Sequence, residues 1–338
     1  MKPKTQPTAL RPLNAAHLKP LGHPARLEVL RHLMRAPASL TVLGKTLGAS
    51  PANIRHHLKI LEAAGLVDLV ARRAVRGFAE KRYRATALAY QVNFFITPAE
   101  EGGPVFLITG SDDPALRYLC RSLADDPAPA AVRLVPTGSL NGLIALRQGL
   151  GGMAAVHLFD PATGSYNEPH VRVLFPDRNV RLIAFVTRTQ GLIVPKGNPA
   201  RIRDLADVAG TKARFINRNR GSGTRLLVNQ LITDAHIEAQ AIEGYTSEAG
   251  THEQVALAVA GGAAAAGMGV LAAAAEAQLD FIPLREERFD LIIPEENLEH
   301  TGVTRLLARM REAPFRKAVE AMGGYGTDRT GTVISLEN

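Results

Sequence analysis

The chain has 338 residues, 46% hydrophobic and 21% charged, which is enough material for two or three globular domains. It contains one cysteine and no tryptophan, which excludes a disulfide framework and a thiolate metal cluster. The formal charge of +8 is uneven: residues 1–95 hold 16 Lys and Arg against 4 Asp and Glu, whereas residues 96–338 hold 24 against 28. This basic N-terminal part predicts a polyanionic partner, most simply double-stranded DNA.

The first segment with periodic apolar residues, 21–96, is called the head here. A basic tail, residues 1–20, precedes it. Within the head, Pro24 opens a helix whose leucines recur at helical spacing. A second helix is predicted over residues 40–47, and a third begins at Pro51 after a serine suited to cap it. This order is typical of a helix-turn-helix.

The third predicted helix carries hydrogen-bonding and cationic side chains opposite its apolar stripe. Such a helix can enter the major groove and contact base edges and phosphates. Two short strands, residues 66–72 and 80–85, flank a basic turn and predict a wing that reaches the phosphate backbone or minor groove. The residues expected to contact DNA are Ser50, Asn53, Arg55, His56, Lys59, Arg73 and Arg76.

The head resembles the ArsR-type winged-helix family over about residues 20–90. The resemblance is carried by LGHPARLEVLRHL, by LGASPANIRHHLKILEAAGLV and by the basic wing. It implies a dimeric module that binds partly palindromic operators. Metal-sensing members carry paired cysteines near the second helix; this chain has none there, so thiolate metal sensing is not expected.

An apolar stretch, residues 87–95, could pack against the head or form a dimer contact, and a linker rich in Pro and Gly follows over 97–104. From residue 105 onwards, in a segment called the body here (105–338), apolar strands alternate with helices. This alternation predicts a mostly parallel sheet with helical crossovers, and the length suits two lobes with a cleft. Strands are expected at 105–109, 131–136, 153–159, 180–186, 192–194, 213–216, 279–282 and 290–293, and helices at 113–124, 140–148, 223–232, 253–259 and 270–277.

Three turns of the body place small hydroxyl residues between a strand and a helix. They are Gly110-Ser111, Gly138-Ser139 and the segment from Gly221 to Thr224. Each turn presents backbone N–H groups at a helix N-terminus, where the helix dipole favours negative charge. Ligands of α/β proteins bind at the carboxyl ends of strands, so three such turns predict an anion site. Arginines near these turns suit an oxyanion, a carboxylate or a phosphate.

The body resembles the periplasmic-binding-protein-like domain related to molybdate-binding proteins, over about residues 105–294. The stretches that carry the resemblance are GSDDPAL, GSLNGLIALRQG, HLFDPATGSYN, RTQGLIVPKGNP, FINRNRGSGTRLL, GYTSEAGTHEQVALAV and LDFIPLREERFDLIIP. It implies two lobes that close on a ligand held by loop hydroxyl and N–H groups. The chain departs from the family at Asp112, Asn219 and Ala264-Ala265, which bears on ligand identity.

The ligand contacts are expected at these turns and around them. The main contacts that the resemblance implies are Ser111, Ser139 and Ser222 or Thr224, with Arg188 and Arg225 nearby. The full expected set is Ser111, Ser139, His157, Arg188, Gln190, Asn217, Arg218, Ser222, Thr224, Arg225, Tyr245 and His252. A purely structural role stays open for His157, Asn217, Arg225 and His252.

These features predict a multidomain cytoplasmic protein in which an α+β winged helix-turn-helix precedes a two-lobed α/β periplasmic-binding-protein-like domain of type 2. We expect a homodimeric one-component transcription regulator that binds double-stranded DNA and a small anionic ligand, with no membrane contact, resident cofactor or metal site. The resemblance makes molybdate or tungstate the first candidate ligand. A molybdenum-cofactor precursor, an organic carboxylate or a phosphate is the alternative.

A second alternative, from another class, is an enzyme or cofactor-delivery protein with a DNA-binding head. The sequence has neither a P-loop nor a nucleophile-elbow pattern. The adjacent acids Glu286 and Glu287 are expected to point apart, so they do not form a facing acid/base pair. We therefore expect no catalysis.

Overall fold

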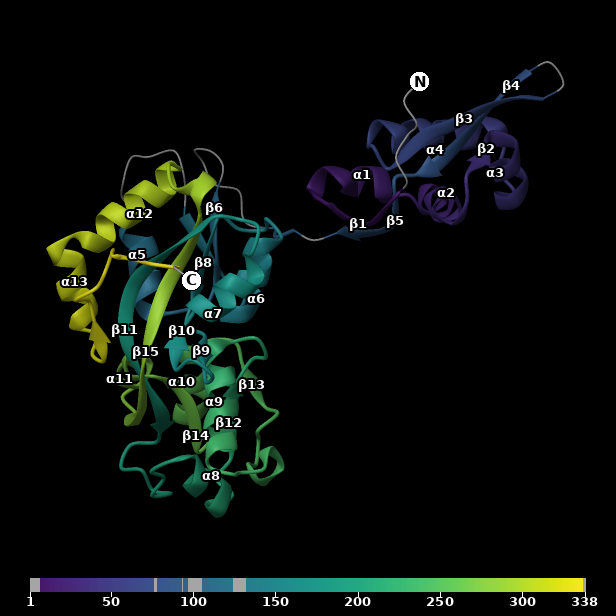
Figure 1. Cartoon of the computed structure of the whole chain (residues 1–338). Coiled ribbons are helices and arrows are strands. Elements are labelled where there is room, and N and C mark those ends of the chain that lie inside the picture. The colour runs from purple at the N-terminus through teal and green to yellow at the C-terminus, as the bar shows by residue number, and fades with distance from the viewer. Residues whose placement is uncertain (1–6, 76–77, 93, 97–104, 124–131, 337–338) are drawn as a thin grey trace. The chain divides into compact units, whose positions relative to one another are not determined.

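The structure is a computed structural model that describes residues 7–75, 78–92, 94–96, 105–123 and 132–336. Two compact units are present, Met1–Thr97, which contains the head, and Pro98–Asn338, which contains the body. Figure 1 shows the helices and strands of both units. The linker expected at residues 97–104 lies outside the described residues.

The head packs α2, α3 and α4 against a three-stranded antiparallel sheet of order β2-β4-β3. Leu30 and Leu33 of α2 face inward, where they form one buried core with Ile54 of α4. Ser39 and Ser50 accept hydrogen bonds from the first-turn amides of α3 and α4, which fixes where these helices begin. The elements are α1 (Leu18–Leu21), α2 (Pro24–Arg35), β2 (Ala38–Ser39), α3 (Leu40–Leu47), α4 (Pro51–Ala63), β3 (Val67–Val75) and β4 (Phe78–Ala85).

The N-terminal segment forms regular structure for which no element is predicted from the sequence. β1 (Thr8–Leu13) pairs in parallel with β5 (Ala87–Val92), and η1 (Ala15–His17) leads into α1. Arg11 donates to the carbonyl of Gly65, and the Tyr90 hydroxyl donates to the Leu66 carbonyl at 2.6 Å. The apolar stretch after the wing therefore packs against the head.

The body contains a mixed sheet of order β13-β12-β14-β11-β15-β8-β6-β7, so the expectation of a mostly parallel sheet is wrong. β6 lies parallel to β7 and β8, and β12 lies parallel to β13 and β14. The two middle strands, β11 and β15, are antiparallel to each other. The bounds are β6 (Phe106–Gly110), β7 (Val132–Pro136), β8 (Met153–Val156), β11 (Val180–Val194), β12 (Phe215–Arg218), β13 (Glu248–Ala249), β14 (Ala266–Val270) and β15 (Asp280–Pro294).

Two pairs of predicted short strands are single long strands in the structure. β11 joins the stretches predicted at 180–186 and 192–194, and β15 joins those at 279–282 and 290–293. Figure 1 shows the two strands side by side, running from one part of the body to the other. Polar residues interrupt both apolar patterns at the crossing, where Arg188 lies opposite Glu287 in the strand register.

The crossing strands join two lobes with separate apolar cores. The first lobe holds β6–β8 and the second holds β12–β14, and each sheet is covered by helices. Helices of the first lobe are α5 (Pro114–Ser122), α6 (Ser139–Arg147), α7 (Glu168–Leu174), α12 (Thr301–Arg311) and α13 (Ala313–Glu320). Those of the second are α8 (Leu205–Thr211), α9 (Gly223–Asp234), α10 (His252–Ala260) and α11 (Leu271–Glu276).

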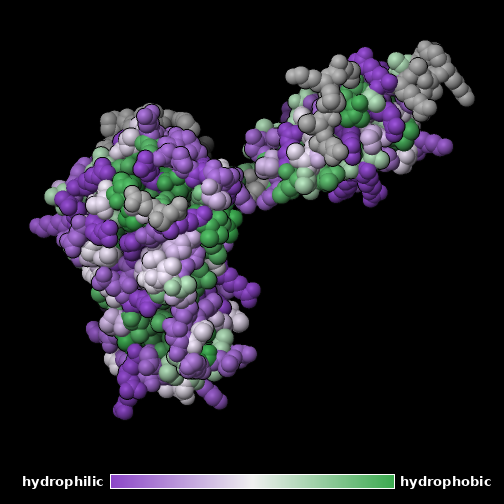
Figure 2. Space-filling model, in the orientation of Figure 1, coloured by the Kyte–Doolittle hydropathy of each residue, from purple (hydrophilic) through white to green (hydrophobic). Residues whose placement is uncertain are grey.

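Several short elements remain. They are β9 (Phe159–Asp160), β10 (Ser165–Tyr166), η2 (Ala239–Ala241), η3 (Glu295–Asn297), β16 (Tyr325–Gly326) and β17 (Val333–Ile334). β16 and β17 pair with β11; of these short elements, only Phe159 of β9 falls within a predicted strand. Hydrophilic side chains cover much of the visible surface of both units (Figure 2). Within the described ranges, no helix has both the length and the apolar character to cross a membrane.

Candidate functional site

The helix-turn-helix presents a polar face on α4. Asn53, Arg55, His56 and Lys59 are exposed along this helix, while Leu58 and its apolar neighbours face the core. Ser50 is also exposed, and its hydroxyl accepts a hydrogen bond from the backbone N–H of Asn53 at 3.3 Å. Of the two expected wing residues, Arg73 belongs to β3 and Arg76 lies outside the described residues.

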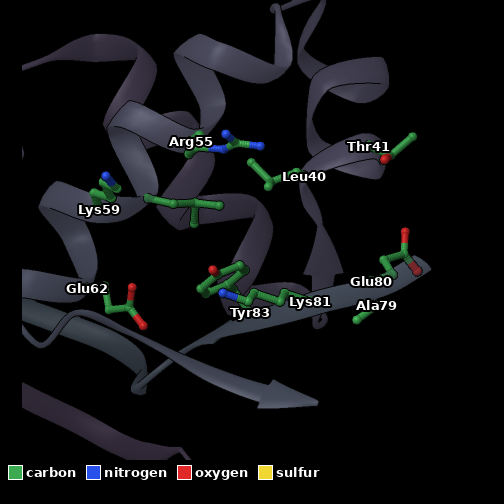
Figure 3. A pocket seen from close by; sticks show the side chains of 10 residues that line it. Leu40, Thr41, Arg55, Lys59, Glu62, Ala79, Glu80, Lys81 and Tyr83 are labelled. Atoms are coloured by element: carbon green, nitrogen blue, oxygen red, sulfur yellow. The ribbon is translucent and has the colours of Figure 1, made fainter. Parts of the chain in front are cut away.

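A hollow of about 580 Å³ separates α4 from the wing strand β4. Figure 3 shows Arg55 and Lys59 on the helix side of this hollow, with Lys81 and Tyr83 on the strand side. Lys81 was not predicted as a DNA contact. It lies two residues before the buried Tyr83 in β4, and residues two apart in a strand share a face. Three cations therefore line the groove between helix and wing, together with the carboxylates of Glu62 and Glu80, and phosphates of a duplex can be reached there.

In the body, the two lobes touch each other through loops and the first turns of helices. The backbone N–H of Leu140, in the first turn of α6, donates to the carbonyl of Gly221 at 3.0 Å. A Cβ on Gly223 would lie 2.6 Å from Cε1 of His157, so this approach of α9 to the first lobe requires glycine. Arg117 of α5 also forms a two-pronged ion pair with Glu253 of α10. Contacts on both sides thus close the cleft.

A chain of hydrogen bonds runs through the first-lobe side of this cleft. Ser139 Oγ lies 2.8 Å from Ser111 Oγ, which lies 2.9 Å from His157 Nε2. His157 Nδ1 lies 3.0 Å from a carboxylate oxygen of Glu287. β6, β7 and β8 are parallel, so their carboxyl ends bring Ser111, Ser139 and His157 to one edge of the sheet.

The charge states of His157 and Glu287 follow from their burial and from their hydrogen-bond partners. Burial lowers the pKa of His157, which keeps its imidazole neutral. Burial alone would raise the pKa of Glu287, but the hydrogen bond from the His157 N–H and the charge of Arg188 lower it to about 2. Because an ionised carboxylate only accepts, His157 Nδ1 carries the imidazole proton and Nε2 accepts from Ser111. The hydroxyl of Ser139 then donates to Ser111.

Arg188 connects this series of hydrogen bonds to the lobe crossing. Its Nε donates to Glu287 at 2.6 Å, and its NH1 donates to Asp113, the N-cap residue of α5. The hydroxyl of Tyr325 donates to the same Asp113 oxygen at 2.9 Å. The guanidinium group is fully buried and held from two sides, so its position is fixed before any ligand arrives.

Four buried side chains of the cleft carry polar atoms without a hydrogen-bond partner among the described residues. These atoms are Arg188 NH2, Arg218 NH1, Gln190 Oε1 and both ring nitrogens of His252. Each of these side chains belongs to a residue at most 1% exposed. Burial and the charge of Arg188 lower the pKa of Arg218 only to about 10, so it stays charged at neutral pH. Unpaired buried polar atoms of this kind, both donors and acceptors, point to a ligand.

The other expected ligand residues make their contacts within the second lobe. Arg225 lies over the ring of Tyr245 at 4.4 Å and donates to the carbonyl of Arg218. Asn217 donates to the carbonyl of Tyr245 at 3.2 Å. Ser222 caps α9 by accepting from the N–H of Arg225 at 3.1 Å. These residues brace the segment between β12, which ends at Arg218, and α9, which carries Thr224.

Sequence reasoning missed several residues that organise the cleft. Asp113 and Glu287 hold Arg188, Tyr325 fixes Asp113, and Arg117 joins the lobes through Glu253. Tyr325 follows Gly323-Gly324 near the end of the chain, where no pattern suggested a functional site. The prediction that Glu286 and Glu287 point apart is confirmed, because Glu286 is exposed and Glu287 is buried.

Comparisons with known proteins identify both domains. A family model described as a PBP superfamily domain matches residues 120–311, and one described as a helix-turn-helix domain matches residues 21–70. The chain is 31% identical over 237 residues to the uncharacterized protein YvgK of Bacillus subtilis (strain 168), which covers 69% of this chain and 75% of that protein.

Two solved structures resemble the body at low sequence identity. The tungstate ABC transporter from Geobacter sulfurreducens is 14% identical with a TM-score of 0.47, covering 64% of this chain and 98% of that one. An ABC-type phosphate transport receptor from Vibrio cholerae is 13% identical with a TM-score of 0.43, covering 65% and 98%. On its domain matches and its similarity to YvgK, the chain belongs to the PBP superfamily domain family and joins that domain to an N-terminal helix-turn-helix DNA-binding domain.

Proposed function

We propose that the protein is a transcription regulator whose body binds a small anion and thereby alters operator binding by the head. The observation that carries the proposal is the pair of buried guanidinium groups, Arg188 and Arg218, each with an unpaired nitrogen in the closed cleft. Two unpaired charged donors in a water-poor site favour an oxyanion, a carboxylate or a phosphate as the ligand. The helix-turn-helix supplies the second half of a one-component regulator.

The anion contacts proposed here come from the lobe crossing and from the second lobe. Arg188 lies on the crossing strand β11, whereas Arg218, Thr224 and His252 belong to the second lobe. α6 and α9 both begin at the contact between the lobes, where Leu140 N–H donates to the Gly221 carbonyl, and the first amides of a helix have no partner within it. Molybdate and tungstate are the ligands suggested by the family resemblance. A molybdenum-cofactor precursor, an organic carboxylate and a phosphate are the alternatives.

The head is proposed to act as an ArsR-type winged helix that binds operator DNA as a homodimer. Exposed apolar side chains on β1 and β5, such as Leu10 and Leu88 at 54% and 53% exposure, support a second copy as partner. Figure 2 shows apolar side chains at the surface of the head over these strands. Lobe closure in the body can shift DNA affinity only if ligand binding favours one arrangement of two heads over another.

The DNA-binding half is tested with Arg55→Ala and with Arg35→Ala as a control of equal charge on α2. Duplexes enriched from random-sequence DNA by the wild-type protein serve as probes, and fluorescence anisotropy gives the affinity. Loss of a base or phosphate contact predicts weakening by about 1–3 kcal/mol for Arg55→Ala and little change for Arg35→Ala. Failure to enrich any duplex, or equal loss in both variants, contradicts the proposal.

A second candidate function is hydrolysis of an ester. Ser111, His157 and Glu287 are joined in the order hydroxyl, imidazole and carboxylate, which is the order that activates a serine nucleophile. In that reaction Ser111 Oγ attacks the carbonyl carbon while His157 Nε2 takes its proton. The ester C–O bond then breaks, the alcohol leaves with the proton returned by His157, and water hydrolyses the acyl-serine that remains. Labelling of wild type by a serine-reactive fluorophosphonate, absent in Ser111→Ala, would favour this candidate over the regulator.

A further inference from the structure

The cleft offers hydrogen-bond acceptors as well as donors. Gln190 shows this most directly, because its Nε2 lies 2.8 Å from Glu287 Oε1 and 2.8 Å from Thr224 Oγ1. An ionised carboxylate cannot donate, so the amide nitrogen of Gln190, rather than its oxygen, must face Glu287. The orientation of the amide is therefore fixed by chemistry. Its oxygen, fully buried, is left without a partner among the described residues.

Thr224 complements this arrangement. Its hydroxyl oxygen accepts from Gln190, so the hydroxyl proton remains available as a donor to the ligand. A buried amide oxygen next to a free hydroxyl proton gives one acceptor and one donor at the same place. Arg188 and Arg218 add charged donors.

His157 determines what the serines present to the ligand. The Ser111 hydroxyl donates a hydrogen bond to the neutral imidazole, and the Ser139 hydroxyl donates one to Ser111. Both hydroxyl protons are thus used inside the first lobe, and Ser111 has only a lone pair left to offer. His252 also offers an acceptor, because burial and the charges of Arg218 and Arg188 lower its pKa well below the usual value and keep the ring neutral. A neutral imidazole keeps one N–H and one lone pair.

We propose that the ligand combines an oxyanion with a hydrogen-bond donor, an O–H or N–H group that is received by Gln190 Oε1. This inference rests on the anion site proposed above and narrows its ligand. Molybdate, tungstate and sulfate are fully deprotonated at neutral pH, so they offer only acceptors and leave Gln190 Oε1 unpaired. Phosphate keeps a proton at this pH, and a 2-hydroxy acid carries a hydroxyl beside its carboxylate.

Matched pairs of ligands test the proposal on the full-length protein by titration calorimetry at pH 7. Phosphate against sulfate compares two tetrahedral anions that differ in an O–H group, and glycolate against acetate does the same for carboxylates. Molybdate completes the panel. An unpaired buried acceptor predicts that the member with the O–H group binds about ten- to a hundredfold more tightly. The pair that shows the preference identifies the source of the anion.

Two variants test whether Gln190 is the residue that distinguishes the two anions of a pair. Gln190→Met removes the acceptor at similar length, so the ratio within a pair is expected to fall to about threefold or less. Thr224→Val removes a donor that serves both members of a pair, so both weaken and the ratio persists. The unfolding midpoint without ligand shows whether each variant is folded, and if Gln190→Met does not fold, the wild-type ratios still decide.

The outcomes separate this inference from the function on which it rests. Equal binding within each pair, or tightest binding of molybdate, overturns the inference while anion binding itself stands. A full ratio retained in a folded Gln190→Met also overturns it, because the donor is then received elsewhere. Binding of no anion in the panel overturns both this inference and the proposed anion site.

Discussion

Glu287 is the residue on which the organisation of the cleft depends. Its carboxylate receives hydrogen bonds from His157, Arg188 and Gln190, which lie far from it in the sequence. One buried charge thereby sets the tautomer of a histidine, the position of a guanidinium group and the orientation of an amide. Such a carboxylate stabilises the fold because its removal leaves a buried cation without its partner.

We predict that Glu287→Gln lowers the free energy of unfolding by about 3–5 kcal/mol at pH 7, as expected when one partner of a buried ion pair is removed. Urea unfolding followed by circular dichroism measures the change. Glu286→Gln provides the matched control, because Glu286 is the adjacent, exposed acid, and a change within about 0.5 kcal/mol is expected there. Similar losses in the two variants would show that the ion pair is not the cause.

The same carboxylate predicts a pH dependence. The pKa of Glu287 is lowered from 4.5 to about 2 in the folded protein, so its ionised form stabilises the fold fully only above about pH 4.5. This contribution is lost as the pH falls from about 4.5 towards 2. The difference in unfolding free energy between wild type and Glu287→Gln should therefore shrink over this interval. A difference that stays constant between pH 6 and pH 3 contradicts the assignment.

At the scale of elements, apolar patterns predicted most strands of the body but not the continuity of β11 and β15. Each strand changes from apolar to polar at the lobe crossing, and the apolar pattern resumes beyond it. Arg188 can be buried there because Glu287 lies opposite, 99 residues further along the chain, and Asp113 pairs with its other side. A local pattern cannot contain that pairing, so the sequence alone predicts a gap between strands at the crossing.

The candidate site was also predictable only in part: its turn residues were predicted, but the acids that organise it were not. Turns between strands and helices located Ser111 and Ser139 because such turns have recognisable residues at fixed positions. The acids Asp113 and Glu287 could not be assigned, since their role depends on which guanidinium group lies nearby in the fold. Arg225 also illustrates this, because its place over the Tyr245 ring follows from packing within the second lobe.

The contact between α5 and α10 carries a prediction about closure. Arg117 pairs with Glu253 across the two lobes, and both side chains are partly exposed. Ion pairs of this kind contribute about 0.2–1 kcal/mol, so Arg117→Ala should weaken anion binding by up to about fivefold while leaving the unfolding free energy nearly unchanged. Calorimetry with the tightest-binding anion of the panel measures this. Arg121→Ala, on the same helix, is the control, and equal affinities in the two variants argue against a role in closure.

At the scale of the whole molecule, the central question is whether the two domains are coupled. A ligand that binds both arrangements of the protein equally shifts nothing, however tightly it binds. The buried position of the cleft residues means that the lobes must open and close during binding, and this motion is the proposed source of different affinities for DNA. Coupling energies between sites are typically about 1–3 kcal/mol, which corresponds to a five- to 150-fold change in affinity.

Thermodynamic linkage makes this coupling testable from both directions. If a saturating anion changes operator affinity by a given factor, then saturating operator DNA must change anion affinity by the same factor. We expect a shared factor of at least about five, measured by anisotropy with labelled DNA and by calorimetry with the anion. Arg218→Met, which lacks one of the unpaired donors, should bind operator as wild type does without anion and show no response to it. Unchanged operator affinity in wild type at saturating anion would mean that the body does not regulate the head, even if each domain binds its own ligand.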